Sequence, residues 1–359
     1  MSCNGAEITC PGECTCRSAF DPNYGSEMRV TCNKGDMTSI PVEYIDHSSD
    51  IVVISAPPDR PNYLTIGPIF TQPIPFSNLK ELHIVNSNIP SIGQYSFWGL
   101  QNLRLINLTH NNLTSIGADN FRGLINLTEL HLDHNNIEQM PSETFRHLTA
   151  LRTLILANNQ ITTLVPRLFR MLAKLQHLDL SYNPLADLNP ETKFLQRLDI
   201  SRNKIQYLTE DDLQRLEAIA HVDLSRNHWR CDQCSVGPML LYMSTTVLNA
   251  TIRNLKCHSP IRLQGVSFAK LKNHKVEPCT TTHEAQMSVI AGVMLLCVAV
   301  LAAATAALCC SRRRAAQYYT NEEKRREHEH EHPEELLGRT EVSNVATINA
   351  PYTLVAKRS

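Results

Sequence analysis

Apolar residues recur along the middle of the chain in a pattern that can be written L-x-x-L-x-L-x-x-N-x-L. The copies start at Leu79, Leu103, Leu127, Leu151, Leu175, Leu195 and Ile219, 24 residues apart except for one spacing of 20. Apolar and other residues alternate with period two across the x-L-x-L core, which predicts a short β-strand with one buried face. One such coil cannot bury its own leucines, so we expect successive coils to stack around a shared core.

An asparagine stands at the ninth position of six copies, and Ser87 takes its place in the first. The asparagines are Asn111, Asn135, Asn159, Asn183, Asn203 and Asn227, and phenylalanines follow four copies at Phe97, Phe121, Phe145 and Phe169. This pattern resembles the leucine-rich-repeat family. The resemblance implies an α/β repeat fold, a solenoid with short parallel β-strands on its concave face. It also implies that the asparagines satisfy backbone groups in the turns, so we assign them to the scaffold.

The repeat region is expected to cover residues 48–226 with about seven or eight repeats. Its first part, residues 48–78, resembles a longer and degenerate repeat in which Ile51 and Val53 fit strand positions. A proline-rich insertion at 56–68 is expected to loop out. Loops of this kind carry binding residues or are simply tolerated, and the sequence leaves both possibilities open.

Twelve cysteines are unevenly placed, and none lies between Cys32 and Cys231. Clusters at both ends of a cysteine-free middle favour disulfides in an oxidising compartment. The clusters resemble the cap modules of extracellular leucine-rich repeats, here at 1–47 and 227–280, with Trp229 plugging the core. That resemblance implies the pairs Cys10–Cys16, Cys14–Cys32, Cys231–Cys257 and Cys234–Cys279. Spacing alone allows three connectivities per cap, and zinc or redox chemistry at Cys231 and Cys234 is the alternative. Cys3 has no assigned partner.

Residues 287–310 form an uninterrupted apolar run without a charge, which predicts a transmembrane helix. Arg312, Arg313 and Arg314 follow at once, and a basic cluster favours the cytoplasmic side. We therefore expect a single-pass plasma-membrane protein with its N-terminus outside and residues 311–359 as a disordered cytoplasmic tail. No leader is visible in the first ten residues, so either a removed leader preceded them or the helix itself inserts.

Solvent-facing strand positions define a candidate protein-binding face. Its residues are Glu129, His131, Asp133, His177, Asp179, Tyr182, Arg197, Arg202, His221 and Arg226. Tyrosine and arginine are enriched at interface hot spots. The column Asp179, Asp199 and Asp223 is equally well explained as scaffold, because Leu-Asp-Leu-Ser is common in the family. Histidines on this face admit pH sensing or metal binding, but solvated surface histidines are the favoured interpretation.

Four Asn-x-Ser/Thr sequons lie on the expected outer side, at Asn107, Asn112, Asn126 and Asn249. A glycan on Asn107 would screen the middle of the concave face. Cys309 and Cys310 stand at the inner membrane boundary and are candidates for palmitoylation. Tyr352 and Val355 resemble a Tyr-x-x-apolar sorting signal.

Catalytic motifs for serine hydrolases, nucleotide binding or zinc hydrolysis are missing from the sequence. We therefore expect a protein that is not an enzyme, and we expect no cofactor and no bound metal. The formal net charge of −1 gives no reason to expect nucleic acid as a partner. The expected partners are an extracellular or membrane protein and the lipid bilayer. The favoured role is a receptor, co-receptor or adhesion protein; a regulatory subunit of a potassium channel is the alternative.

Overall fold

A ten-stranded sheet runs through the repeat part of the chain in the computed structural model. The structure describes residues 10–21, 25–70, 76–188, 195–245, 248–276 and 282–331. The chain divides into two units, Met1–Cys279 and Thr280–Ser359, which are taken separately below.

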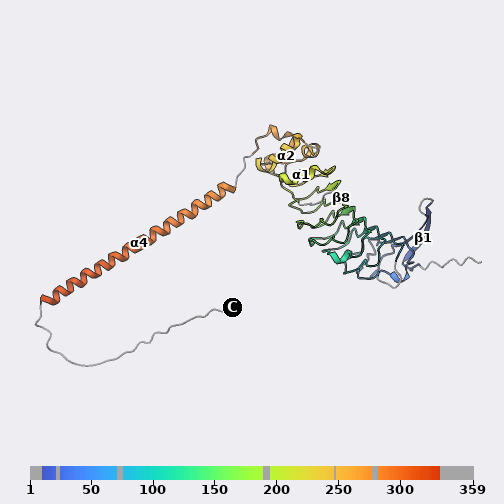
Figure 1. Cartoon of the computed structure of the whole chain (residues 1–359), viewed down its shortest axis with the longest axis horizontal. Coiled ribbons are helices and arrows are strands. Elements are labelled where there is room, and N and C mark those ends of the chain that lie inside the picture. The colour runs from blue at the N-terminus through green and yellow to red at the C-terminus, as the bar shows by residue number, and fades with distance from the viewer. Residues whose placement is uncertain are drawn as a thin grey trace, which may run out of the picture. The chain divides into compact units, whose positions relative to one another are not determined.

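The sheet follows chain order from first strand to last (Figure 1). β1 (Cys14–Asp21) and β2 (Gly25–Cys32) form an antiparallel hairpin that opens the sheet. Eight parallel strands follow: β3 (Ile51–Ile54), β4 (Glu81–Ile84), β5 (Leu105–Asn107), β6 (Glu129–His131), β7 (Thr153–Ile155), β8 (His177–Asp179), β9 (Arg197–Asp199) and β10 (His221–Asp223). Equivalent residues of successive copies pair directly, as Leu130 does with Leu154, which confirms the stacked-coil prediction.

The leucine positions form one continuous core beneath the sheet. On the side of the core away from the strands, the predicted phenylalanines stack in a column, with ring centroids 6.4 Å apart for Phe97 and Phe121 and 6.5 Å for Phe121 and Phe145. Trp229 is fully buried at the C-terminal end, and its indole Nε1 donates to the carbonyl of Leu224 at 3.2 Å. The prediction that Trp229 closes the core is confirmed.

The asparagine ladder ties neighbouring coils together. Asn159 is a typical member: its Oδ1 accepts from the backbone N–H of Ile137 in the coil before, at 2.9 Å. Its Nδ2 donates to the carbonyls of Leu132 in that coil and Leu156 in its own, at 3.0 and 3.1 Å. The side chain is buried, so its hydrogen bonds satisfy backbone groups that water does not reach in the turn. The predicted scaffold role of this column is confirmed.

The first repeat has a register that differs from the expected one. Val52 and Ile54 face the core and pair with Leu82 and Ile84, whereas Val53 is only half-buried and pairs with the outward-facing His83. Because side chains alternate with period two, a shift by one residue exchanges the two faces of a strand. The apolar run at 51–54 hides this choice, because all four of its residues suit a buried position.

Short helices occupy the loops and the C-terminal cap. α1 (Glu210–Glu217) replaces a phenylalanine coil, and Thr209 begins it with a capping box. The cap contains α2 (Gln233–Thr245) and α3 (Asn249–Asn254). Four 3₁₀ turns complete the described helices of this unit: Val42–Tyr44, Ala118–Phe121, Ile261–Leu263 and Phe268–Asn273.

Disulfides hold both caps. Cys10 bonds to Cys16, Cys14 to Cys32 and Cys231 to Cys257, the pairs that the family resemblance implies. Cys234 is also disulfide-bonded. Its expected partner, Cys279, lies outside the described residues, as does Cys3.

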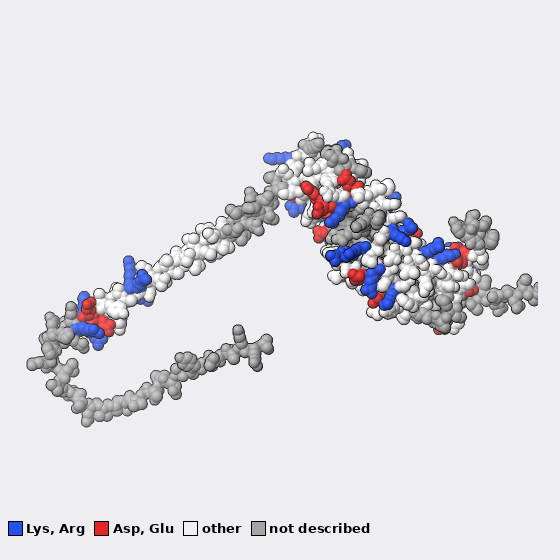
Figure 2. Space-filling view, viewed as in Figure 1, with Lys and Arg blue, Asp and Glu red and all other residues white. Residues whose placement is uncertain are grey.

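The described part of the second unit is one helix, α4 (Thr282–Glu331). Its segment Ala291–Arg326 is long and apolar enough to cross a membrane, and no other described helix is. Figure 2 shows the uncharged stretch ending at a group of basic side chains, which corresponds to Arg312–Arg314. Helix α4 continues past the apolar run to Glu331, because Ala, Gln, Glu, Lys and Arg favour a helix and no proline interrupts them before Pro333.

Candidate protein-binding surface

The residue that ends each strand turn adopts a left-handed backbone conformation. This eighth position of the repeat has φ between 50° and 57° at Asn86, His110, His134, Asn158, Tyr182, Arg202 and Arg226. A residue with a Cβ enters this region at a steric cost, so the coil geometry imposes it. Within these turns the backbone N–H of Tyr182 donates to the carbonyl of Ser201, and that of Arg202 to Ser225, at 3.0 and 2.9 Å. The side chains of this column are therefore held at fixed places along one edge of the sheet.

Three residues of this column form the most distinctive part of the predicted face. The guanidinium carbon of Arg202 lies 4.4 Å from the ring centroid of Tyr182, a cation–π contact. Together with Lys204, Arg226 and His228 they line an open hollow of about 540 Å³. We call these five residues the C-terminal patch. The ring of Tyr182 is 46% exposed, so a large aromatic side chain and several donors are available to a partner.

The carboxylates of the aspartate column (Asp179, Asp199 and Asp223) accept local hydrogen bonds. Asp179, Asp199 and Asp223 each accept from the backbone N–H of the serine two residues later, at 2.9, 2.9 and 2.8 Å. These bonds close the turn after each strand, which favours the scaffold interpretation. Burial, together with the neighbouring carboxylates of Asp179 and Asp223, raises the pKa of Asp199 despite the hydrogen bonds from Ser201.

Other predicted residues lie on the strands beside this column. His177 is half-buried, and burial, helped by Arg197 and His131, lowers its pKa against the opposing influence of Asp179 and Asp199. Arg197 and His221 are exposed on β9 and β10. The structure therefore brings His177, Asp179 and Arg197 together on the neighbouring strands β8 and β9, where His177 pairs with Arg197.

The N-terminal members of the predicted face pair with each other. His131 lies 3.5 Å from the carboxylate of Glu129, and Asp133 lies 3.0 Å from His134. Asp133 also accepts from the hydroxyl of Thr109 at 3.0 Å. Asp133 therefore has internal partners and offers less to a ligand than the C-terminal patch does, whereas the Nε2 of His131 is buried without a hydrogen-bond partner among the described residues.

The four sequon asparagines differ in their surroundings. Asn112 and Asn126 are exposed on edges of the solenoid. Asn107 is half-buried on β5, where its Oδ1 accepts from the backbone N–H of Thr109 at 2.9 Å. Asn249 opens α3, and its Oδ1 is buried without a hydrogen-bond partner. Exposure therefore favours Asn112 and Asn126 as glycan acceptors.

The predicted modification sites of the C-terminal region are only partly described. Cys309 and Cys310 are exposed free thiols on α4, directly before the basic cluster. Tyr352 and Val355 lie outside the described residues.

One exposed aromatic cluster has no counterpart in the sequence prediction. Trp98 is 46% exposed on the convex side. The guanidinium carbon of Arg122 lies 5.3 Å from the ring centroid of Tyr95 and 5.7 Å from that of Trp98. Tyr95 also has a left-handed φ of 58°. Tyr95 and Trp98 stand outside the repeated leucine and phenylalanine positions, and this is the signal that sequence reading could have used.

Comparisons with known proteins agree with this architecture. The sequence model of the leucine-rich-repeat family matches residues 77–137 and 125–185. The solved structure of human 5T4 (Wnt-activated inhibitory factor 1, trophoblast glycoprotein) is similar with a TM-score of 0.61 and 24% identity, over 75% of this chain and 99% of that chain. The comparison with curated proteins gave no match. The chain thus contains leucine-rich repeats, and together with the disulfide-bonded caps and the apolar helix α4 these fit a leucine-rich-repeat single-pass membrane protein.

Proposed function

We propose that this chain is a cell-surface receptor, co-receptor or adhesion protein that binds another protein through the C-terminal half of its repeats. The C-terminal patch carries the proposal. It combines an exposed tyrosine with arginines in fixed positions, the residue types that contribute most to protein interfaces. The leucine-rich-repeat fold supports a scaffold that recognises proteins rather than one that performs chemistry, and the proposed role is not enzymatic.

We also propose that the N-terminal unit is outside the cell and residues after the membrane helix are inside. Two observations support this orientation. The basic cluster follows the apolar segment directly, and the disulfides lie in the unit that precedes it. Glycosylation of the sequons and palmitoylation of Cys309 and Cys310 remain proposals of the same kind.

The test uses variants that respect the left-handed turns. Tyr182→Asn, Arg202→Asn and Arg226→Asn remove the patch but keep a residue that tolerates positive φ, because asparagine already stands at this position in Asn86 and Asn158. The matched control is His110→Asn with His134→Asn, at the same position in earlier coils. Neither set creates a new sequon.

Proximity labelling with the full-length chain on cells identifies candidate partners, and binding of each is then measured with the purified full chain. We expect the triple variant to weaken a true partner by about thirtyfold or more, the effect of a single hot-spot residue, while the control binds as the wild type does. Equal binding by the triple variant would reject the C-terminal patch as the site.

The channel-subunit alternative requires the membrane segment and its basic flank rather than the repeats. Replacing residues 287–310 and Arg312–Arg314 by an unrelated membrane helix and flank leaves a receptor's binding intact. If this replacement abolishes the effect of the chain on cells while replacement of the repeats does not, the receptor proposal fails and the regulatory-subunit role is favoured.

A further inference from the structure

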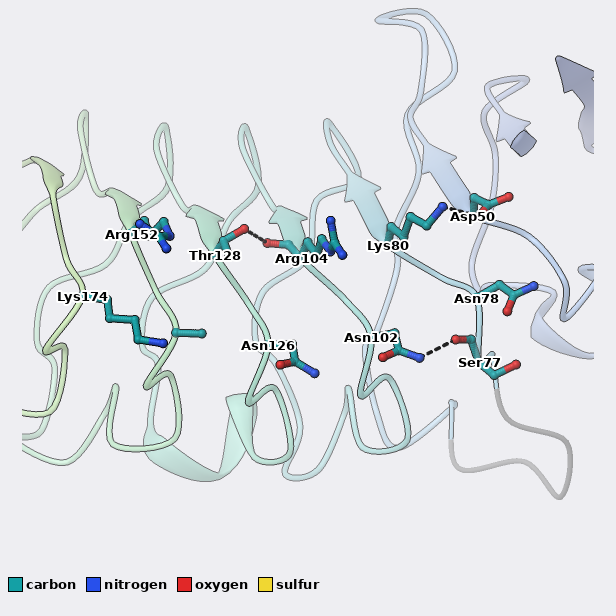
Figure 3. Close-up of a pocket in the computed structure, with 11 residues that line it drawn as sticks. Asp50, Ser77, Asn78, Lys80, Asn102, Arg104, Asn126, Thr128, Arg152 and Lys174 are labelled. Atoms are coloured by element: carbon teal, nitrogen blue, oxygen red, sulfur yellow. Dashed lines mark hydrogen bonds and ion pairs between the residues drawn. The ribbon is translucent and has the colours of Figure 1, made fainter. Parts of the chain in front are cut away.

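Two rows of polar side chains line the edge of the sheet at which the parallel strands begin (Figure 3). The upper row holds the residue just before each strand: Lys80, Arg104, Thr128 and Arg152. The lower row holds the residue before each leading leucine: Asn78, Asn102, Asn126, the apolar Ala150 and Lys174. Between them they border an open hollow of about 670 Å³. This edge is distinct from the C-terminal patch, which shares none of its residues.

The backbone of the upper row is a continuous ladder. The N–H of Arg104 donates to the carbonyl of Lys80 at 2.7 Å, that of Thr128 to Arg104 at 2.8 Å, and that of Arg152 to Thr128 at 2.8 Å. Coils that pair in this way lie about 4.8 Å apart. The side chains of the row therefore project at regular intervals from a rigid support.

Two asparagines of the lower row are held by hydrogen bonds from their side chains to the neighbouring coil. The Nδ2 of Asn102 donates to the carbonyl of Ser77 at 2.7 Å, and the Nδ2 of Asn126 donates to that of Gln101 at 2.9 Å. Both asparagines keep their side-chain oxygens without a described hydrogen-bond donor, so these oxygens can accept from a ligand's hydroxyl group.

Positive charge along this edge is not neutralised from within. The one acidic residue that lines the hollow, Asp50, is nearly buried, accepts from the backbone N–H of Met28 at 2.9 Å and pairs with Lys80 at 2.9 Å. Arg104, Arg152 and Lys174 are exposed, and none has an ion pair among the described residues. We call these three residues the basic row. Unpaired guanidinium and ammonium groups bind oxyanions through charge-assisted hydrogen bonds.

The acidic residues that follow Lys80 and Thr128 in the sequence, Glu81 and Glu129, contact histidines instead. The carboxylate of Glu81 lies 3.1 Å from His83 and that of Glu129 lies 3.5 Å from His131, on the concave side, and neither residue lines the hollow. An anion that approaches the edge therefore meets three free cations and hydrogen-bonding groups rather than a mixed field.

The composition of the edge favours a carbohydrate polyanion over a protein. Among the described residues, no aromatic or large aliphatic side chain lines the hollow, so they offer no apolar pocket for the anchor residues that protein interfaces use. The cations recur along a line that crosses the coils, with neutral Asn and Thr residues between them (Figure 3). We propose that the basic row binds a sulfated glycosaminoglycan chain running across the coils, with sulfates on Arg104, Arg152 and Lys174 and hydroxyl groups on the intervening amides.

Asn126 gives this site a built-in limit. It belongs to the sequon Asn126-Leu-Thr128 and stands in the middle of the lower row. A glycan on this residue would cover the hollow, so the site is open only in molecules that lack it. The test is therefore made in an Asn126→Gln background, in which the amide remains and the sequon is lost.

The experiment measures binding of a fluorescent heparin octasaccharide to the purified full chain in detergent. Against the background protein, Arg104→Gln, Arg152→Gln and Lys174→Gln together should weaken binding at least about tenfold, because each exposed ion contact contributes modestly and the three contacts add. The matched control removes three exposed cations outside the hollow, through Arg170→Gln, Lys270→Gln and Lys275→Gln, and should change binding less than threefold, roughly the effect of one weak surface contact. An equal loss in both variants would overturn the proposal.

Two further arms separate the chemistry. The charge-keeping variant Arg104→Lys, Arg152→Lys and Lys174→Arg should retain heparin binding. If this variant loses heparin binding completely, a site that acts through charge is overturned. A desulfated heparin octasaccharide should fail to bind. If a poly-glutamate peptide binds as tightly as heparin and depends on the same three residues, the ligand is an acidic protein segment and the polysaccharide proposal is rejected.

Discussion

The rings of His228 and His258 stack in the C-terminal cap with their centroids 4.3 Å apart and an angle of 13° between the planes. The first belongs to the turn that follows the last asparagine of the ladder, and the second lies next to the Cys231–Cys257 disulfide. This stack joins the end of the solenoid to the cap. It also places two imidazole rings in direct contact.

Acidification is expected to weaken this junction. Burial, with smaller contributions from His258 and Lys204, lowers the pKa of His228 below its ordinary value. A histidine whose folded-state pKa is depressed takes up a proton more readily in the unfolded chain, so stability falls as the pH drops through the unfolded value of about 6.5. Thermal unfolding of the full chain should show a lower midpoint at mildly acidic than at neutral pH.

The variant His228→Gln isolates this contribution. It should reduce the difference in midpoint between the two pH values, while Gln160→Ala, which changes an exposed residue without a titratable group, should leave it unchanged. An identical pH dependence in wild type and His228→Gln would assign the acid sensitivity to other groups.

Removing one amide from the asparagine ladder is expected to destabilise the repeats strongly. Asn159→Ala deletes an acceptor for Ile137 and donors to Leu132, Leu156 and Ala157, all buried. Leaving several buried backbone groups unpaired should cost about 2–4 kcal/mol. Denaturant unfolding of the full chain measures the change, with the exposed neighbour Gln160→Ala as the control.

A finer substitution separates the two halves of the amide. Asn159→Asp keeps the acceptor for Ile137 but loses the donors to the carbonyls, so it should not restore wild-type stability. A change below about 0.5 kcal/mol in either variant, the level of an ordinary surface substitution, would show that the turn recruits water in place of the side chain.

Much of this fold could be predicted from the sequence because the same pattern of leucine and asparagine positions recurs in every coil. Leu130 and Leu154 could be placed on one buried column, and Asn111 to Asn227 in one ladder, from spacing alone. The family resemblance supplied the pairing of the cap cysteines, which spacing leaves open among three connectivities.

The parts that sequence reading missed depend on choices that the pattern does not constrain. At Ile51–Ile54 every residue is apolar, so the pattern cannot choose which face is buried. Arg104 and Lys174 stand at positions outside the leucine core, and they share an edge only because the coils stack.

The C-terminal cap is expected to depend on its disulfides. Cys231 and Cys257 are buried and separated by 26 residues. Replacing both by serine should reduce stability by about 2–4 kcal/mol, because the bond restricts a loop of this length in the unfolded chain. The unfolding midpoint of the full chain under non-reducing conditions provides the measurement.

Peptide mapping of the wild-type chain without reduction tests the remaining pair. A peptide that joins Cys234 to Cys279 is expected from the resemblance to the cap module. Detection of a peptide that links Cys234 to Cys3 or to another chain would contradict the expected Cys234–Cys279 disulfide.

The orientation of the membrane segment can be determined through the sequons. With the N-terminal unit outside, Asn112 should carry a glycan in all molecules and Asn126 in a fraction of them, because both are exposed and the basic row is open only where Asn126 is bare, while Asn249 should be modified less, because its amide oxygen is buried. Each Asn→Gln variant of a modified site should remove one step from the shift that endoglycosidase produces on a gel. The tail supplies the control: Ala346→Thr creates the sequon Asn344-Val-Thr, which should remain unmodified in the cytoplasm. Glycosylation at Asn344 together with bare Asn112 and Asn126 would reverse the proposed topology and place the repeats inside the cell, where the basic row and the C-terminal patch would meet a different set of partners.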